Sequence, residues 1–229
     1  QDLKLTGSVL FVIPDNFQDD NVFPLGPGYL ASVLIHAGCN VESYCMDVFH
    51  HSNDELKKLL LTRNFDAVCL GFMGPRFKRG IEQSCLAIKQ SISPDTLFII
   101  GGYGPSSCPE YMLRKTKADV AVIGEGEETI LEIMMAHLDG SKDFSNIMSV
   151  AYLKQSVYVE NPRRKTIKTL KNIPHPAWDI FPMEKYTSCL RFSRMTESDR
   201  AFPIMSTRGC TDKCSFCFRL DSGIRVRKP

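Results

Sequence analysis

The sequence predicts a doubly wound α/β domain, because short apolar runs alternate five times with amphipathic helical patterns. Continuous apolar runs of this kind are typical of parallel strands that are covered on both faces. The 229-residue chain is 43% hydrophobic, which is enough for one sizeable core and an appendage. We expect the α/β domain at residues 1–140, an interdomain connector at 141–200 and the beginning of a second domain at 201–229.

Five strands are expected, and turn residues or glycine follow them. They are residues 8–13, 41–45, 67–70, 97–100 and 120–123. Helical patterns separate them, the first beginning near Gly28, and capping boxes at 52–55 and 107–110 favour two further helix starts. The last helix has Glu127 in its first turn, where the helix dipole favours an acid, and Gly140 closes it. The pattern predicts a five-stranded parallel sheet of the Rossmann/flavodoxin-like kind.

Glycine follows three of the expected strands, at Gly71, Gly101 and Gly124. Right-handed crossovers bring the carboxyl ends of the strands to one edge, where such sheets bind ligands. Glycine there lets a ligand approach the backbone closely, although an ordinary tight turn explains any single one. The loop at 14–24 contains no glycine before Gly26, so the Gly-x-Gly-x-x-Gly motif of a dinucleotide site is missing after the first strand.

The connector contains a predicted hairpin and a proline-rich run. Residues 150–153 and 157–160 alternate apolar and polar side chains around a short turn. Residues 173–179 contain too much proline for a helix or a central strand. We expect Trp178 in this run to anchor the packing between the two domains.

Three cysteines stand close together near the C-terminus, at Cys210, Cys214 and Cys217. Thiolates at such short spacings typically hold iron–sulfur clusters. Three thiolates on a four-iron cluster would leave one iron open to another ligand. A structural zinc site needs four ligands, and the nearest other cysteine is Cys189. A zinc site with a distant fourth ligand and three unrelated buried thiols are the alternatives.

Composition excludes several classes of function. The net charge of +2 is too small to indicate a nucleic acid or a membrane surface as partner. No apolar run approaches the ~20 residues that a membrane span needs. Nine cysteines without disulfide-like regularity favour a reducing compartment, and we expect a cytoplasmic protein.

The three cysteines, with Phe216 just before the third, resemble the signature of the radical S-adenosylmethionine (SAM) enzymes. The resemblance implies a [4Fe–4S] cluster whose open iron binds SAM and whose electron cleaves it to a 5′-deoxyadenosyl radical. The apolar stretch at 202–205 is similar to the first strand of the family's TIM-type barrel. A full barrel takes about 250 residues, whereas this chain runs from Gln1 and ends at Pro229. We therefore expect a piece of a longer enzyme, truncated after the cluster motif and inactive alone.

Residues 8–139 resemble the cobalamin-binding domain that precedes the barrel in class B radical SAM enzymes. The matching stretches are Pro14 after the first strand, residues 24–30, Gly101-Gly102 and residues 124–127. The resemblance implies cofactor contacts by Pro14, Leu25, Gly26, Gly71, Phe72, Gly101, Gly102, Tyr103, Gly124, Glu125, Gly126 and Phe216. Many cobalamin proteins ligate cobalt through the histidine of an Asp-x-His-x-x-Gly motif, which the loop at 14–24 lacks. We expect no histidine under the cobalt and regard Tyr103 as a possible neighbour.

The function that the resemblance implies is that of a cobalamin-dependent radical SAM methyltransferase. Cobalamin in its cob(I) state would take a methyl group from one SAM, and a second SAM would supply the radical that activates a carbon (or phosphorus) centre. A small-molecule substrate and an electron donor such as flavodoxin or ferredoxin are implied, with no nucleic acid and no membrane. Two alternatives are a cyclase or rearrangement enzyme without methyl transfer and a non-catalytic cobalamin-binding module.

Overall fold

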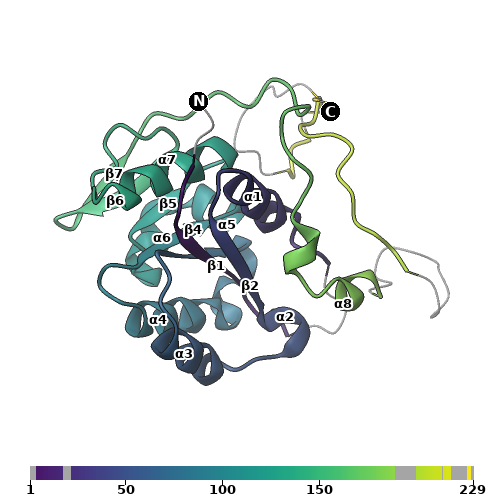
Figure 1. Ribbon diagram of the computed structural model, residues 1–229. Helices are drawn as coiled ribbons and strands as arrows, with labels where there is room; N and C mark the ends of the chain where they lie inside the picture. Colours follow the sequence, from purple (N-terminus) through teal and green to yellow (C-terminus); the bar gives the residue numbers. More distant parts are fainter. Residues whose placement is uncertain (1–3, 18–21, 189–199, 213, 218–225, 228–229) are drawn as a thin grey trace.

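The computed structural model describes residues 4–17, 22–188, 200–212, 214–217 and 226–227. Within them, seven strands form one sheet in the order β2-β1-β3-β4-β5-β6-β7 (Figure 1). The strands are β1 (Ser8–Ile13), β2 (Asn40–Cys45), β3 (Ala67–Gly71), β4 (Leu97–Gly101), β5 (Val120–Val122), β6 (Val150–Lys154) and β7 (Val157–Glu160). The first five are parallel, and β6 and β7 are antiparallel to their neighbours. The predicted parallel, doubly wound Rossmann/flavodoxin-like fold is confirmed, and the order of its first five strands is that of flavodoxin.

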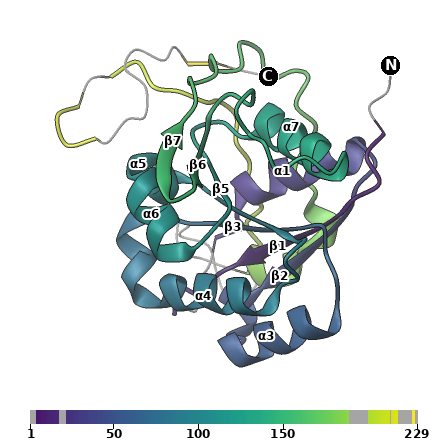
Figure 2. The ribbon, with the colours of Figure 1, turned by 90° about the vertical axis from the view of Figure 1, so that its left-hand side faces the viewer.

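Helices cover both faces of the sheet (Figure 2). They are α1 (Leu25–His36), α2 (Met46–Phe49), α3 (Asn53–Thr62), α4 (Glu82–Ser91), α5 (Tyr103–Ser107), α6 (Pro109–Thr116), α7 (Glu127–Leu138) and α8 (Met183–Thr187), with 3-10 or π turns at Gly74–Arg76, Phe77–Ile81 and Trp178–Ile180. Helices α1 and α7 lie on one face, and α3, α4 and α6 lie on the other. Among the described residues, each helix is too short or too polar to cross a membrane.

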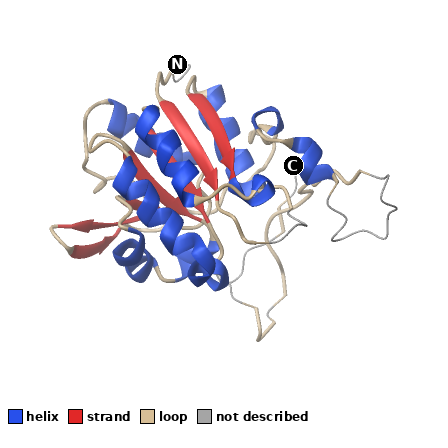
Figure 3. Cartoon of the chain, turned by 90° about the horizontal axis from the view of Figure 1, so that it is seen from below, coloured by secondary structure: helices blue, strands red, loops and turns tan. Residues whose placement is uncertain are grey.

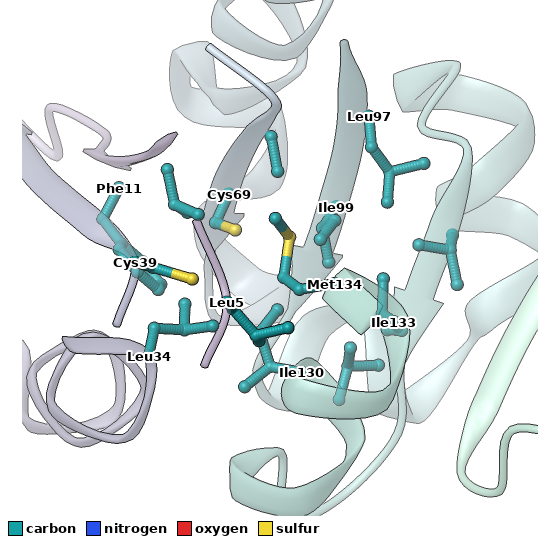
Figure 4. Close-up of a cluster of buried hydrophobic side chains, with 14 of the residues drawn as sticks. Leu5, Phe11, Leu34, Cys39, Cys69, Leu97, Ile99, Ile130, Ile133 and Met134 are labelled. Atoms are coloured by element: carbon teal, nitrogen blue, oxygen red, sulfur yellow. The ribbon is translucent and has the colours of Figure 1, made fainter. Parts of the chain in front are cut away.

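The core has two layers because successive side chains of each strand point to opposite faces. Val9 and Phe11 of β1 belong to the cluster under α1 and α7, where Leu34 and Met134 meet the strands (Figure 4). Leu10, the residue between them, belongs to the second cluster, under α3, α4 and α6. Each fully buried Leu or Ile stabilises the fold by about 1.5–3 kcal/mol relative to exposure. A strand that is buried on both faces therefore needs the continuous apolar run found in the sequence.

The predicted hairpin forms, but it extends the sheet instead of lying in a separate connector. Strand β6 pairs with β5, with Val122 opposite Val150, and Figure 3 shows the hairpin reaching out at one end of the sheet. An unpaired β5 would expose a row of backbone donors and acceptors, which β6 satisfies. The predicted five-stranded sheet is thus a seven-stranded one. The divisions at residues 140 and 200 stay predictions.

The predicted helix starts are partly confirmed. Ser52 caps α3 as expected, since its Oγ accepts from the backbone N–H of Glu55, and the Glu55 side chain accepts from Ser52 N–H. The second expected capping box is wrong, because Ser107 ends α5 and its Oγ donates to the Gly104 carbonyl. Pro109 takes the first position of α6, where its missing N–H costs nothing, so the helix starts one residue later than a Ser107 cap requires.

The predicted strand at 202–205 does not form within the described part of the chain. Phe202 and Ile204 are exposed, and Arg208 instead pairs with Arg227 through an isolated antiparallel bridge. A barrel strand needs hydrogen-bonding neighbours along its edges, and the described residues provide none for this stretch.

Candidate functional site

Glycines lie at or just after the carboxyl ends of β3, β4 and β5, which form an open edge of the sheet. Gly71 and Gly101 end neighbouring strands and lie opposite each other in the register. A Cβ atom at Gly71 would meet only the Gly101 carbonyl oxygen, at 3.7 Å, and one at Gly101 only Val122 Cβ, at 3.9 Å. Gly124, with φ +81°, has no atom within 4 Å of its Cβ position. Three adjacent strands therefore offer bare backbone to a ligand.

Large apolar side chains follow the ends of three strands at this edge. Phe17 follows β1, Met73 follows β3 and Tyr103 follows β4, and each is more than half exposed. Exposed apolar groups gathered at the ligand edge of such a sheet favour a binding surface. Sequence analysis found Tyr103 but missed Phe17 and Met73, although each is a large apolar residue shortly after a strand.

Three of the predicted contact residues are instead buried. Phe72 packs in the core, where its ring stacks on Phe77 at 5.4 Å between centroids. It follows Gly71 directly, so the alternation of the strand sends its side chain to the opposite side. Pro14 is buried, and Gly126 lies under α1, where an added Cβ would come within 3.2 Å of Leu30. These residues shape the packing beneath the edge.

The other predicted residues lie on or near the surface. Gly102 is exposed with φ +92°, and an added Cβ would approach the Phe72 carbonyl oxygen to 2.9 Å, so a glycine is required there. Gly26 is exposed in the first turn of α1 with open space around it. Leu25 is half-buried against the aromatic cluster described next. The part that each plays in cofactor binding stays a prediction.

The ends of β1 and β2 are closed by the chain itself. Ile13 and Cys45, at the ends of these strands, form a cluster with Phe23, Phe181 and Tyr186. The Phe23 ring meets Phe181 edge-on at 5.1 Å and Tyr186 at 5.6 Å. Helix α8 accordingly lies beside α2 in Figure 1. The open part of the edge is thereby confined to β3, β4 and β5.

A buried carboxyl group holds this cover in place. The Tyr186 hydroxyl lies 2.9 Å from Asp47 Oδ1 and 3.0 Å from Oδ2, and donates to this carboxyl group. Burial raises the pKa of Asp47 from 3.8 to about 6, although the bond from Tyr186 lowers it. Burial also raises the pKa of the neighbouring Cys45 thiol, to about 11. Neither group forms part of the open edge.

Asp47→Asn should remove a pH dependence of stability. The folded protein keeps the Asp47 proton to a higher pH than the unfolded chain, so the free energy of unfolding falls as the pH rises from 3.8 to about 6. The full effect is about 3 kcal/mol, of which about 2 kcal/mol lies between pH 4.5 and pH 7.5. Urea unfolding at these two pH values measures the effect. From the lower to the higher pH, the free energy of unfolding of Asp47→Asn should rise by that amount relative to the free energy of unfolding of wild type. The control variant Asp54→Asn, at an exposed carboxyl group, should show no such rise. If the free energies of unfolding of Asp47→Asn and wild type change with pH in parallel, the pH dependence does not come from Asp47.

His50 lies near the closed part of the edge. Its Nδ1 is 3.0 Å from Asp15 Oδ2, so residues that follow β1 and α2 form a pair. The expectation that no histidine lies under the cobalt stays a prediction.

The cysteine loop is exposed. Cys210, Cys214 and Cys217 all face solvent, as does Phe216, and the Cys217 N–H donates to the Cys214 carbonyl at 3.2 Å. Their exposure contradicts the alternative of three unrelated buried thiols. Within the described residues, no three Cys, His, Asp or Glu side chains are close enough together to hold a metal ion. The iron–sulfur cluster therefore stays a prediction, which the three exposed thiols support.

Arg208 and Arg227 lie on either side of this loop in the sequence, and both bind the turn after β5. Arg227 donates to both carboxylate oxygens of Glu125, at 2.7 and 2.9 Å. Arg208 Nη1 lies 2.6 Å from Glu127 Oε1. Burial by itself would raise the pKa of Glu125, but the hydrogen bonds from Arg227 and Ile167 N–H and the arginine charges lower it. Glu125 was predicted to contact cobalamin, but both of its carboxylate oxygens accept hydrogen bonds from Arg227.

The fold and the edge define a class of protein: a flavodoxin-like α/β domain with glycines along the open carboxyl edge of its sheet. The B12 binding domain family matches residues 19–134 of the chain. The chain belongs to this family. Its predicted cobalamin-binding fold is thereby confirmed.

Curated relatives include a methyltransferase and a cyclase. Cytidylyl-2-hydroxyethylphosphonate methyltransferase of Streptomyces wedmorensis is 25% identical over 236 residues, covering 85% of this chain and 43% of the relative. Anaerobic magnesium-protoporphyrin IX monomethyl ester cyclase of Rubrivivax gelatinosus is 27% identical over 214 residues, covering 90% of this chain and 37% of the relative. The chain thus spans about two fifths of the length of these relatives.

Two solved structures share the fold over nearly the whole chain. The radical SAM methyltransferase TsrM from Kitasatospora setae, with cobalamin and a [4Fe–4S] cluster bound, has a TM-score of 0.73 at 18% identity, covering 98% of this chain and 43% of TsrM. The cobalamin-dependent SAM radical enzyme OxsB, with aqua-cobalamin bound, has a TM-score of 0.77 at 20% identity, covering 97% of this chain and 30% of OxsB. The predicted resemblance to cobalamin-dependent radical SAM enzymes is confirmed at the level of the fold.

Proposed function

We propose that this chain is the cobalamin-binding and cluster-bearing part of a radical SAM enzyme that transfers a methyl group to a small molecule. The observation that supports this most directly is the position of the turn after β5. Gly124 of this turn borders the open edge, and Glu125 and Glu127 bind the arginines on either side of the cysteines. One turn therefore borders both proposed cofactor sites.

The open edge suits a corrin ring. A broad flat macrocycle needs a surface without side chains, and Gly71, Gly101 and Gly124 supply bare backbone on three adjacent strands. Its apolar faces and edges need partners, and Tyr103 and Met73 are available beside the glycines.

The cysteine loop suits an iron–sulfur cluster. Its three thiols are exposed on one short stretch, so they can turn toward a common centre without unfolding the core. The three cysteines leave one iron of a four-iron cluster for SAM.

When bound, these cofactors supply the radical and methyl chemistry, and the protein contributes binding and orientation. Residues 178–187 close the ends of β1 and β2, which confines a ligand to the glycine part of the edge. The arginine–glutamate contacts hold the start of the cysteine loop against the same domain. Holding the reacting groups in fixed positions is the main way in which such a chain can accelerate a reaction.

Methyl transfer is the preferred reaction because the relatives from Streptomyces wedmorensis and Kitasatospora setae are named as methyltransferases. The cyclase relative, which matches 90% of this chain, supports ring formation as the second candidate. For either reaction we propose a small-molecule substrate, an electron donor such as flavodoxin or ferredoxin, and a cytoplasmic location.

Anaerobic reconstitution of the full-length protein tests the proposal. After incubation with iron, sulfide and hydroxocobalamin, we expect a [4Fe–4S] cluster and one cobalamin to stay bound through gel filtration, and SAM to be cleaved upon reduction. Formation of S-adenosylhomocysteine beside 5′-deoxyadenosine would support methyl transfer, and 5′-deoxyadenosine alone would support the cyclase. Uptake of zinc but not iron, or loss of cobalamin on the column, would refute the proposed function.

A further inference from the structure

The turn between β5 and α7, residues 124–127, has two sides with different surroundings. Gly124 follows β5 at this end of the sheet and has no atom within 4 Å of its Cβ position. The carboxylates of Glu125 and Glu127 point toward Arg227 and Arg208. The same short turn therefore lies between the proposed cobalamin surface and the segment that enters the cysteine loop.

The contacts in this cluster are directional. Arg227 binds Glu125 through two parallel hydrogen bonds, a geometry that fixes orientation as well as distance. Arg208 binds Glu127, and its guanidinium lies 4.8 Å from the centre of the Tyr29 ring of α1. The backbones of Arg208 and Arg227 also exchange two hydrogen bonds, of 2.9 and 2.8 Å. The entry to the cysteine loop is thus held by α1, the β5 turn and residue 227.

The four charges are shielded from solvent and balanced. The side chains of Glu127, Arg208 and Arg227 are 8%, 13% and 11% exposed, and that of Glu125 is 22% exposed. A shielded ion pair adds little net stability, because desolvation offsets the attraction, but removing one partner strands a charge. The Arg63–Glu42 pair is far more exposed, and such surface pairs contribute little in either respect. The two shielded ion pairs therefore fix the positions of the bonded groups more than they stabilise the fold.

We propose that Glu127 and Arg208 are positioning residues that fix the cysteine loop relative to the cobalamin edge, an inference that rests on the proposed function. Only Gly209, with φ +97°, separates Arg208 from Cys210. A guanidinium held between Glu127 and Tyr29 therefore determines where the first cluster ligand leaves the domain.

Glu127→Gln tests this in the full-length protein, with Arg63→Gln as the matched control on an exposed pair. The Arg208 and Arg227 amides, which are bonded to each other's carbonyl oxygens, should exchange hydrogen about tenfold faster in Glu127→Gln, and at the wild-type rate in Arg63→Gln. At equal iron content, the electron paramagnetic resonance signal of the reduced cluster with SAM should broaden, because the loop samples several positions. Tyr29→Leu, which leaves no stranded charge, should give the same changes to a smaller extent.

The outcomes separate this inference from the proposed function. Unchanged amide exchange and an unchanged resonance signal in a Glu127→Gln protein that still holds iron and cobalamin would overturn the positioning role alone. Faster exchange with a wild-type resonance signal would also overturn it, because the contact would then be merely structural. A wild-type protein that binds neither iron nor cobalamin would instead refute the proposed function.

Discussion

The Cys214→Ala variant of the full-length protein should lose its iron–sulfur cluster and all SAM cleavage while it keeps cobalamin. Cys214 stands between the other two ligands, and two remaining thiolates cannot hold the cluster that three support. Its side chain is exposed, so the substitution opens no cavity. The cobalamin edge is built from β3, β4 and β5 and contains none of the loop cysteines.

Iron and sulfide analysis, visible absorption and 5′-deoxyadenosine formation measure this loss after anaerobic reconstitution. Cys108→Ala is the matched control, since Cys108 is also exposed but precedes α6. It should retain the cluster, SAM cleavage and cobalamin. Wild-type iron content in Cys214→Ala would mean that the three cysteines do not share one metal centre.

The architecture of the sheet was predictable because its strands are buried on both faces. The run from Val9 to Ile13 has to be apolar throughout, since Val9 and Leu10 enter different clusters. The pairing of β6 with β5 was not predictable in this way. A hairpin pattern shows that two segments pair with each other, but it carries no information about which sheet edge they extend.

The candidate site was predictable where a residue acts through its own backbone. Gly71, Gly101 and Gly124 lie open at the edge as their positions after strands suggested. Phe72 and Gly126 are buried, Phe72 against Phe77 and Gly126 beneath Leu30, and their contact with cobalamin stays a prediction.

Contacts between distant segments could not be predicted from local sequence patterns. The Arg227–Glu125 pair joins residues that are 102 positions apart, so neither spacing nor periodicity marks it. Phe23 and Tyr186 likewise meet only because residues 178–187 return over β1 and β2. Such contacts determine which part of the edge stays open, and this part of the site needed the structure.

Gly71→Val should abolish cobalamin binding and leave the fold intact. At this position a Cβ would make only an ordinary contact, 3.7 Å from the Gly101 carbonyl oxygen, and valine is favoured in strands. The added methyl groups would instead occupy the space where the corrin must approach the backbone. We expect the affinity for hydroxocobalamin to fall at least about 100-fold, which corresponds to roughly 2.7 kcal/mol.

Gly104→Val is the matched contrast, because the same residue change meets a packed environment there. An added Cβ would lie 2.7 Å from Phe72 Cδ2, so this variant should lose about 1–3 kcal/mol of folding free energy. Spectroscopic titration with hydroxocobalamin and thermal unfolding distinguish the two effects: Gly71→Val changes the first and Gly104→Val the second. If a folded Gly71→Val protein binds hydroxocobalamin as tightly as wild type, the corrin ring does not lie over the ends of β3 and β4.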